Sequence, residues 1–253
     1  MARFHIIGAA ALIAAAGQAG AEIVLLEDFE DAAIGYVASP ADDLGDIATY
    51  DYFGRIAPDT ASPPAGVAYG NRQGEGYFGV QDSDSVPGGP DSVQLDWTGI
   101  DIAGFTGLTL SWYVAEADAI NGDEDWDGDT AFRIEAQLDG GGFVPIFGIA
   151  GTGPDTAPRV DTDLDGIGDG AEITALFTQY SASIADGALL DIRVRFDNLD
   201  AGDEDLAFDS LRLEGDLPTA AVPLPASLPL AGLGLLALGA LARRRRRRQA
   251  ENA

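Results

Sequence analysis

The chain of 253 residues contains no cysteine and no lysine, and its one histidine and one methionine are His5 and Met1. A domain that begins near residue 22 therefore lacks the side chains needed for Ser-His-Asp, Cys-His and Schiff-base catalysis. Zinc and copper sites built on thiolate or imidazole are excluded for the same reason. Only carboxylate chemistry is left, which means oxygen ligation of hard cations or an acid pair of the glycosidase kind. Without disulfides, an exported domain must be held together by its core or by metal.

Positive charge is also scarce in the body of the chain. All 14 basic residues are arginines, and seven of them are Arg3 and the run at 243–248. Residues 22–221 hold 41 acids and 7 arginines, a formal charge of 7 − 41 = −34. Such a surface repels phosphate backbones, which argues against nucleic acid as a partner, and it attracts cations. A solvated acidic coat suited to a saline habitat explains most of these acids.

The first residues have the order of a secretory signal. Arg3 precedes an apolar stretch from Ile6 to Ala16, and the small residues Ala19-Gly20-Ala21 follow. The apolar stretch is too short and too rich in alanine to span a bilayer comfortably. We therefore expect residues 1–21 to be a signal peptide that is cleaved after Ala21, with an uncleaved anchor as the alternative.

The other end of the chain places an uncharged stretch directly before a run of arginines. Residues 226–242 form a stretch of 17 residues without charge, which as a helix would reach about 26 Å, the low end of a membrane span. Under the positive-inside rule, the arginines stay in the cytoplasm and stop transfer. We expect a linker rich in Pro and Ala at 217–225, a transmembrane helix at 226–242 and a cytoplasmic tail at 243–253, at least transiently anchored in the inner membrane. The predicted stop-transfer residues are Arg243, Arg244, Arg245, Arg246, Arg247 and Arg248.

A short motif precedes the predicted helix. It consists of Val222, Pro223, Leu224, Pro225 and Ala226. Followed by an apolar helix and terminal arginines, it resembles a VPLPA-type PEP-CTERM sorting signal. The resemblance implies bacterial export and handling by an exosortase-type membrane enzyme that sorts surface proteins. It covers residues 222–253 only and implies nothing about residues 22–221.

The middle of the chain has the pattern of half-buried strands. The segments 190–197 (LDIRVRFD) and 131–139 (AFRIEAQLD) alternate apolar with polar or charged residues, which is typical of antiparallel strands with one buried face. Other predicted strands lie within residues 22–29, 76–82, 92–97, 108–117, 142–150, 176–185 and 206–215. A short helix at the start of 171–180 is an open alternative.

These strands are short and are separated by loops rich in Gly, Asp and Pro, with no long amphipathic helix between them. Such a pattern predicts that residues 22–216 form one all-β domain, a two-sheet antiparallel β-sandwich of jelly-roll type. Trp97 and Trp112 fall within apolar strand patterns, and we expect both in the core.

The loop DTDLDGIGDGAE at 161–172 fits the hard-cation pattern D-x-[DN]-x-[DN]-G-x5-E. Calcium needs six to eight oxygens on a tight path, which the alternating acids and Gly166 would provide. The predicted Ca²⁺ ligands are Asp161, Asp163, Asp165, Ile167 through its carbonyl, Asp169 and Glu172. The preceding segment, with its Gly and Pro, cannot be an entering helix, so a paired EF-hand is not expected. The sequence DTDLDGIGD resembles a thrombospondin type 3 repeat, although only one copy is present and the cysteine that usually follows such a repeat is missing. A solvated acidic loop is the alternative.

A second acidic loop is NGDEDWDGDT at 121–130. Its alternating aspartates would repel one another on an extended backbone, and a cation would relieve that repulsion. The second candidate metal site is therefore Asp123, Asp125, Asp127 and Asp129, with an exposed acidic turn as the alternative. Trp126, in their midst, is either a platform for stacking on a sugar ring or an anchor that pins the loop to the core.

The two ends of the domain offer a third candidate metal site. LEDFED near the start and LAFDSL near the end contain Glu30 and Asp209. Jelly-roll carbohydrate-binding modules resemble this arrangement and often hold a structural calcium between their first and last strands. The resemblance implies that Asp28, Glu30 or Asp31 lies near Asp209.

Two classes of function follow. The first is an exported, membrane- or surface-sorted, calcium-stabilised β-sandwich module without catalytic activity, for adhesion to or organisation of extracellular polysaccharide. The alternative is a secreted glycan hydrolase with a carboxylate pair drawn from Glu116 or Glu135 and an aspartate. We favour the module, because the chain has only three tryptophans and a glycosidase cleft usually holds several aromatic residues.

Overall fold

The structure, a computed structural model, describes residues 20–31, 35–46, 51–57, 60, 67–84, 91–117 and 126–217, together with Arg243. The predicted signal peptide before Gly20, the sorting motif and the predicted transmembrane segment lie outside the described residues, as do all the terminal arginines except Arg243. In the part of the chain that is described, no helix combines the length and the apolar character required to cross a membrane.

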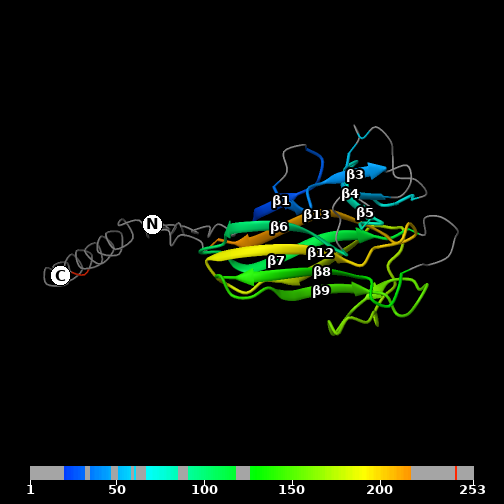
Figure 1. The fold of residues 1–253 in the computed structure, drawn as a ribbon. Helices are drawn as coiled ribbons and strands as arrows, with labels where there is room; N and C mark the ends of the chain where they lie inside the picture. The colour runs from blue at the N-terminus through cyan, green and yellow to red at the C-terminus, as the bar shows by residue number, and fades with distance from the viewer. Residues whose placement is uncertain are drawn as a thin grey trace, which may run out of the picture. The chain divides into compact units, whose positions relative to one another are not determined.

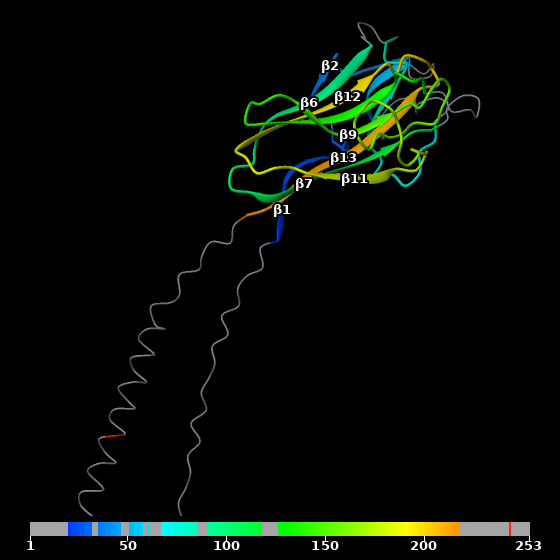
Figure 2. The same ribbon diagram turned by 90° about the horizontal axis from the view of Figure 1, so that it is seen from below.

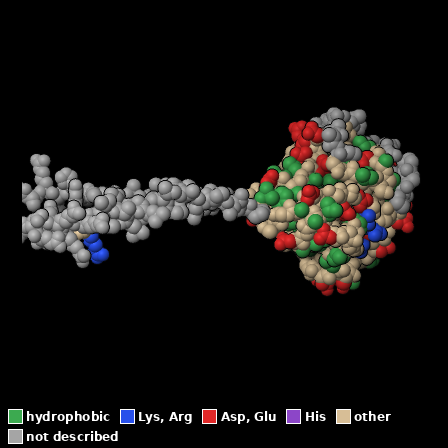
Figure 3. All heavy atoms as spheres, turned by 90° about the vertical axis from the view of Figure 1, so that its left-hand side faces the viewer, with side chains coloured by type: hydrophobic (Ala, Val, Ile, Leu, Met, Phe, Trp, Pro, Cys, Tyr) green, Lys and Arg blue, Asp and Glu red, His purple; other side chains and the backbone are tan. Residues whose placement is uncertain are grey.

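Residues up to Pro218 form one compact unit, and residues 219–253 form another that contains a single described residue. The first unit contains both hydrophobic clusters of the described chain. Residues 22–217 therefore carry both of these described clusters and are suited to study as an isolated domain. On the face of the domain seen in Figure 3, acidic side chains are scattered widely, and basic side chains gather in one area.

The described residues form thirteen strands. They are β1 (Ala21–Glu27), β2 (Val37–Ser39), β3 (Asp43–Asp46), β4 (Asp51–Ile56), β5 (Tyr77–Gln81), β6 (Ser92–Asp101), β7 (Thr106–Ala115), β8 (Ala131–Leu138), β9 (Val144–Ala150), β10 (Arg159–Val160), β11 (Thr178–Ser183), β12 (Leu189–Asp197) and β13 (Asp205–Asp216).

These strands make two sheets that pack face to face (Figure 1). One sheet has the order β11-β7-β13-β5-β4-β3, with β1 also paired to β13, and the other has the order β10-β9-β8-β12-β6-β2. Every paired strand runs antiparallel to its neighbour. The predicted all-β, two-sheet antiparallel sandwich is thus confirmed.

The main core lies between the sheets. Ile134 of β8 and Val194 of β12 lie opposite each other in register, and both are fully buried. The arginines that alternate with them lie on the outer face, as the period of two predicts. Trp97 and Trp112 are also buried, as expected. Burial of each large apolar side chain stabilises the fold by about 1.5–3 kcal/mol.

The sequence pattern missed β4 and the short strands β2, β3 and β10. β4 does not alternate, because it is covered on both faces: Phe53 points into the main core, whereas Tyr52 packs with Tyr77 and Phe177 in a second cluster. The alternative of a short helix at 171–180 is excluded. There, Glu172 forms an isolated bridge with Arg159, and Thr178 begins β11.

Candidate metal centre

The predicted calcium loop follows β10 and is fastened at both ends. The backbone N–H of Asp161 donates to the carbonyl of Gly148 in β9 at 2.9 Å, and the carbonyl of Val160 accepts bonds from Asp169 and Gly170 at 3.1 and 2.7 Å. Gly166 has a φ of 95°, in the left-handed region that glycine adopts without steric cost. The backbone therefore closes into a tight loop on the edge of the second sheet.

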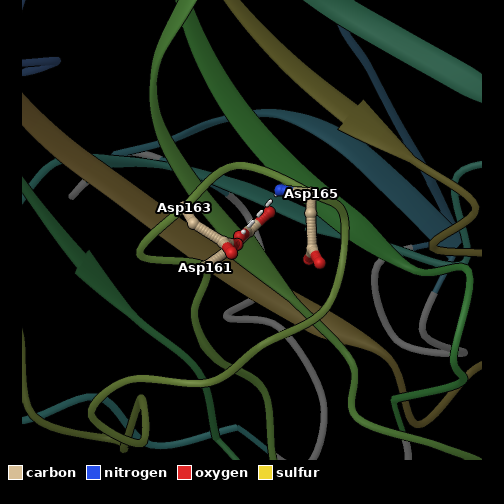
Figure 4. A group of neighbouring side chains, drawn as sticks. All are labelled: Asp161, Asp163 and Asp165. Carbon is tan, nitrogen blue, oxygen red and sulfur yellow. Dashed lines mark hydrogen bonds between the residues drawn. The ribbon is translucent and has the colours of Figure 1, made fainter.

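The first three acids of this loop come together. A carboxylate oxygen from each of Asp161, Asp163 and Asp165 lies within 4.8 Å of the others, and Figure 4 shows the three side chains gathered in the turn. Asp161 is 4% exposed, whereas Asp163 and Asp165 are exposed. The group is thus buried on the side of Asp161 and open to solvent on the side of Asp163 and Asp165.

Asp161 organises the loop around itself. Its Oδ1 accepts a hydrogen bond from the backbone N–H of Asp165 at 3.2 Å, and its Oδ2 accepts one from that of Gly166 at 2.8 Å. These two bonds offset part of the cost of burying a carboxylate. They also fix the path of the backbone that carries the other two acids.

The three carboxylates repel one another. The pKa of Asp163 is raised above its ordinary value, chiefly by the negative charge of Asp165. A divalent cation would remove this repulsion, and carboxylate oxygens are the ligands that Ca²⁺ prefers. The first three positions of the predicted site therefore have the chemistry of a hard-cation site.

The last two acids of the pattern have other partners. Asp169 Oδ1 accepts bonds from the backbone N–H and the hydroxyl of Thr162, at 2.9 and 2.7 Å, which lower the pKa of Asp169. Glu172 Oε2 lies 2.6 Å from Arg159 Nη2. The N–H of Ile167 donates to Asp165 Oδ1. The structure brings three of the six predicted ligands together. Asp169 and Glu172 instead bind Thr162 and Arg159, and these contacts hold the backbone of the loop in place.

The second acidic loop is described only in part. Asp123 and Asp125 lie outside the described residues, and Asp127 and Asp129 are exposed. The negative charges of both lie close to Asp200, whose pKa is raised chiefly by burial and then by its acidic neighbours. Two further neighbours that the sequence pattern did not identify are Asp84 and Asp91.

Trp126 does not lie where a sugar could stack on it. Its side chain is 0% exposed, and its Nε1–H donates to the carbonyl of Asp205 at 3.3 Å. The hypothesis of glycan stacking on Trp126 is therefore wrong, and the indole instead anchors the loop to the core. A large apolar ring with one polar atom is well suited to this role when a carbonyl lies within reach.

The third candidate site does bring distant residues together. Asp209, in β13, is 0% exposed, and its Oδ2 has no hydrogen-bond partner in the described structure. The pKa of Asp209 is raised to about 7, chiefly by burial and in smaller part by the charge of Glu30. Asp209 Oδ1 accepts a bond from the Ser210 hydroxyl at 3.1 Å. A buried carboxylate oxygen without a partner is nevertheless costly, so this position favours a proton or a cation.

Glu30 is held by a segment that the sequence did not point to. Its Oε1 accepts bonds from the backbone N–H groups of Glu75 and Gly76 at 2.7 and 2.9 Å. This approach needs Gly74, which has a φ of 152° and where a Cβ would lie 1.9 Å from Glu30 Oε1. The chain after β1, the segment 73–76 and β13 therefore meet at one point.

The two glutamates weighed for a glycosidase lie apart from each other in the fold. Glu116 follows β7 of the first sheet and is 2% exposed. Glu135 lies in β8 of the second sheet, opposite Arg193 in register. Each was considered with an aspartate as its partner, and that pairing stays a prediction.

Comparisons with known proteins give structural similarity without sequence similarity. No protein-family model and no curated protein sequence matches the chain. The CBM22-1 xylan-binding domain of Xyn10C from Paenibacillus barcinonensis is similar over 80% of this chain and 99% of its own, with 11% identity and a TM-score of 0.39. The K3 cleaved adhesin domain of Lys-gingipain from Porphyromonas gingivalis covers 77% of this chain and 99% of its own, with 16% identity and a TM-score of 0.40.

A Stig cyclase, Fisc from Fischerella sp. TAU, is similar over 79% of this chain and 100% of its own, with 13% identity and a TM-score of 0.42. With TM-scores below 0.5, these similarities carry no information about what this chain binds or whether it catalyses a reaction.

Proposed function

We propose that residues 22–217 form an exported, calcium-stabilised module without catalytic activity that adheres to or organises extracellular polysaccharide. The observation that carries the proposal is the cluster of Asp161, Asp163 and Asp165, whose carboxylate oxygens lie within 4.8 Å of one another. Three acids held this closely, one of them buried, favour a divalent cation over an empty loop.

The shape of this cluster supports a role in binding. Calcium takes six to eight oxygen ligands, more than three aspartates supply through one atom each. Since Asp163 and Asp165 are exposed, the ion's open side would face solvent, where water or oxygens of a polysaccharide could complete its coordination. Asp169 or Glu172 would join only by leaving Thr162 or Arg159.

A second calcium ion is proposed between the ends of the domain, with Asp209 and Glu30 as ligands. The support is the buried Asp209 Oδ2, which lacks a hydrogen-bond partner among the described residues, and the nearby charge of Glu30. A cation there would neutralise two acids at once and tie β13 to the chain that follows β1. It would stabilise the jelly-roll arrangement that we propose for these strands.

Export and surface sorting complete the proposal. They rest on the signal-like residues 1–21 and on the motif, apolar stretch and arginine run of residues 222–248. Extracellular fluid commonly holds millimolar calcium, enough to occupy a site of the modest affinity typical of extracellular modules, with Kd of about 10⁻⁴–10⁻³ M.

The test is a glycan array probed with residues 22–217 in millimolar calcium and again in chelator. We expect calcium-dependent binding to polysaccharides, strongest for those with carboxylate groups, and loss of binding in the variant Asp163→Ala/Asp165→Ala. The matched control is Asp101→Ala/Asp191→Ala, which removes two acids from β6 and β12, strands that do not carry the metal loop. Absence of binding to any glycan in either condition would refute the polysaccharide role while leaving the calcium site to be tested separately.

A further inference from the structure

One edge of the first sheet is free of charge in an otherwise acidic domain. No charged residue occurs between Glu172 and Asp186, and β11 (TQYSAS) lies in the middle of this stretch. β11 is the end strand of the first sheet and pairs only with β7 among the described strands (Figure 2). Its exposed residues are Gln179, Ser181 and Ser183, together with Thr178 at its start.

The backbone of this edge is open from Gln179 to Ser183, beyond the bridge between Gly70 and Leu176. Ile184 N–H donates to Leu108 O in the register that β11 shares with β7. Because the direction of backbone groups alternates along a strand, the even-numbered residues face β7 and the odd-numbered residues face outward. Consistent with this, Phe177 N–H turns away from β7 and donates to Gly70 O. The N–H and C=O groups of Gln179, Ser181 and Ser183 therefore point outward, and no described residue pairs with them.

The other described edges carry features that discourage pairing. β1 contains Glu22 and Glu27 and has an irregularity between Ile23 and Leu25. β2 has three residues and is followed by Pro40. β10 has two residues, and the register of β3 is irregular. Charge, proline, bulges and short length are the devices by which proteins protect sheet edges, and β11 has none of them.

We propose that β11 is an interface at which a second copy of this chain adds to the first sheet. The choice of occupant follows from charge. A basic partner would be drawn to the acidic faces, whereas two copies of formal charge −34 over residues 22–221 repel each other least where both surfaces are neutral. A neutral, polar edge is complementary to itself, as a two-fold interface requires.

The pairing has one register that uses all three outward-facing residues. In an antiparallel arrangement about a two-fold axis, Ser181 lies opposite Ser181 of the other copy, and Gln179 lies opposite Ser183. Each such pair would exchange N–H···O bonds in both directions. Their side chains are small or neutral, so no like charges meet across the new pair of strands.

The experiment is sedimentation velocity of residues 22–217 over a concentration series up to about 100 μM, where a modest interface would be populated. We expect a reversible dimer that strengthens as salt screens the acidic domains from each other. Ser181→Pro should give a monomer with an unchanged melting temperature, since the lost N–H points away from β7 and proline is tolerated on such an edge.

A charge exchange tests the register directly. Ser181→Lys and Ser181→Glu should each weaken the dimer by about fivefold, and an equimolar mixture of the two should restore it, because the changed residues then face each other as opposite charges. Thr98→Lys, on the interior strand β6, is the matched control and should leave the dimer intact. A wild-type protein that stays monomeric at every concentration, or a dimer that survives Ser181→Pro, would overturn the proposal.

Discussion

The guanidinium of Arg159 lies 2.6 Å from the carboxylate of Glu172, so the acid in the twelfth position of the calcium pattern is already paired with the strand that leads into the loop. Both side chains are more than one-third exposed, at 40% and 44%. An ion pair of this kind contributes about 0–1 kcal/mol, which calcium could outweigh. We therefore propose that Glu172 anchors the loop through Arg159 in the absence of calcium and becomes a ligand when calcium binds.

This relationship predicts opposite effects of two substitutions. Arg159→Gln should tighten calcium binding by up to about fivefold, because Glu172 no longer has to leave a partner. Glu172→Gln should weaken binding. Isothermal titration calorimetry with calcium measures both, with Arg212→Gln as a control for the removal of one positive charge. A dissociation constant unchanged in Glu172→Gln would remove Glu172 from the set of ligands.

Asp209 predicts a pH dependence of stability in calcium-free protein. Burial raises the pKa of Asp209 from 3.8 to about 7, so the folded state holds this proton more tightly than the unfolded chain. Stability should therefore be lost as the pH rises from about 4 to about 7, by an amount of up to ~4 kcal/mol. Below about pH 4, Asp209 is protonated in both the folded and the unfolded state, so stability no longer changes with pH through this group.

The substitution Asp209→Asn isolates this effect. In chelator, the variant should melt at a higher temperature than the wild type at pH 8 and at the same temperature at pH 4. In millimolar calcium at pH 8, the variant should lose the stabilisation that the proposed second ion gives. If Asp209→Asn is no more stable than the wild type in chelator at pH 8, then burial of the ionised Asp209 carboxylate does not destabilise the fold, and this account of Asp209 is wrong.

Glu204 should contribute to the stability of the fold, although it is not part of the metal loop. This side chain is 1% exposed, and its Oε2 accepts bonds from Asp200 and Ala201 N–H at 2.8 and 3.2 Å. Its Oε1 accepts bonds from Asp127 N–H and Thr130 Oγ1 at 3.1 and 2.5 Å. Glu204→Gln would set an amide NH₂ against two donors and should cost about 1–3 kcal/mol in urea unfolding. The exposed-face control Glu135→Gln should cost much less, and equal losses would count against this role.

The strands were predictable where one face of a sheet is buried and the other meets water. The segments around Ile134 and Val194 alternate cleanly for that reason, and Trp97 and Trp112 were correctly placed in the core. β4 was missed because both of its faces are buried, which removes the alternation that the prediction relies on. The strand content of the fold thus follows from the sequence wherever the packing is one-sided.

The metal loop was predictable in part for a similar reason. Asp161, Asp163 and Asp165 are close in sequence, so local spacing alone brings their carboxylates together. The surroundings of Asp209 depend on residues from three distant segments, and spacing cannot reveal the bonds from residues 75 and 76 to Glu30. The indole of Trp126 likewise donates to the carbonyl of Asp205, which is distant in sequence.

Calcium stabilisation of the sandwich is the central claim, and thermal unfolding of chelator-treated residues 22–217 with and without millimolar calcium tests it most directly. Millimolar calcium is up to about a tenfold excess over a Kd of about 10⁻⁴–10⁻³ M. A tenfold excess adds about 1.4 kcal/mol, which for a domain of this size raises the melting temperature by about 3–6 °C. Asp163→Ala/Asp165→Ala should lose most of that shift, and magnesium should substitute poorly because it demands octahedral geometry. Identical melting temperatures with and without calcium would contradict the account and leave these aspartates as surface charge.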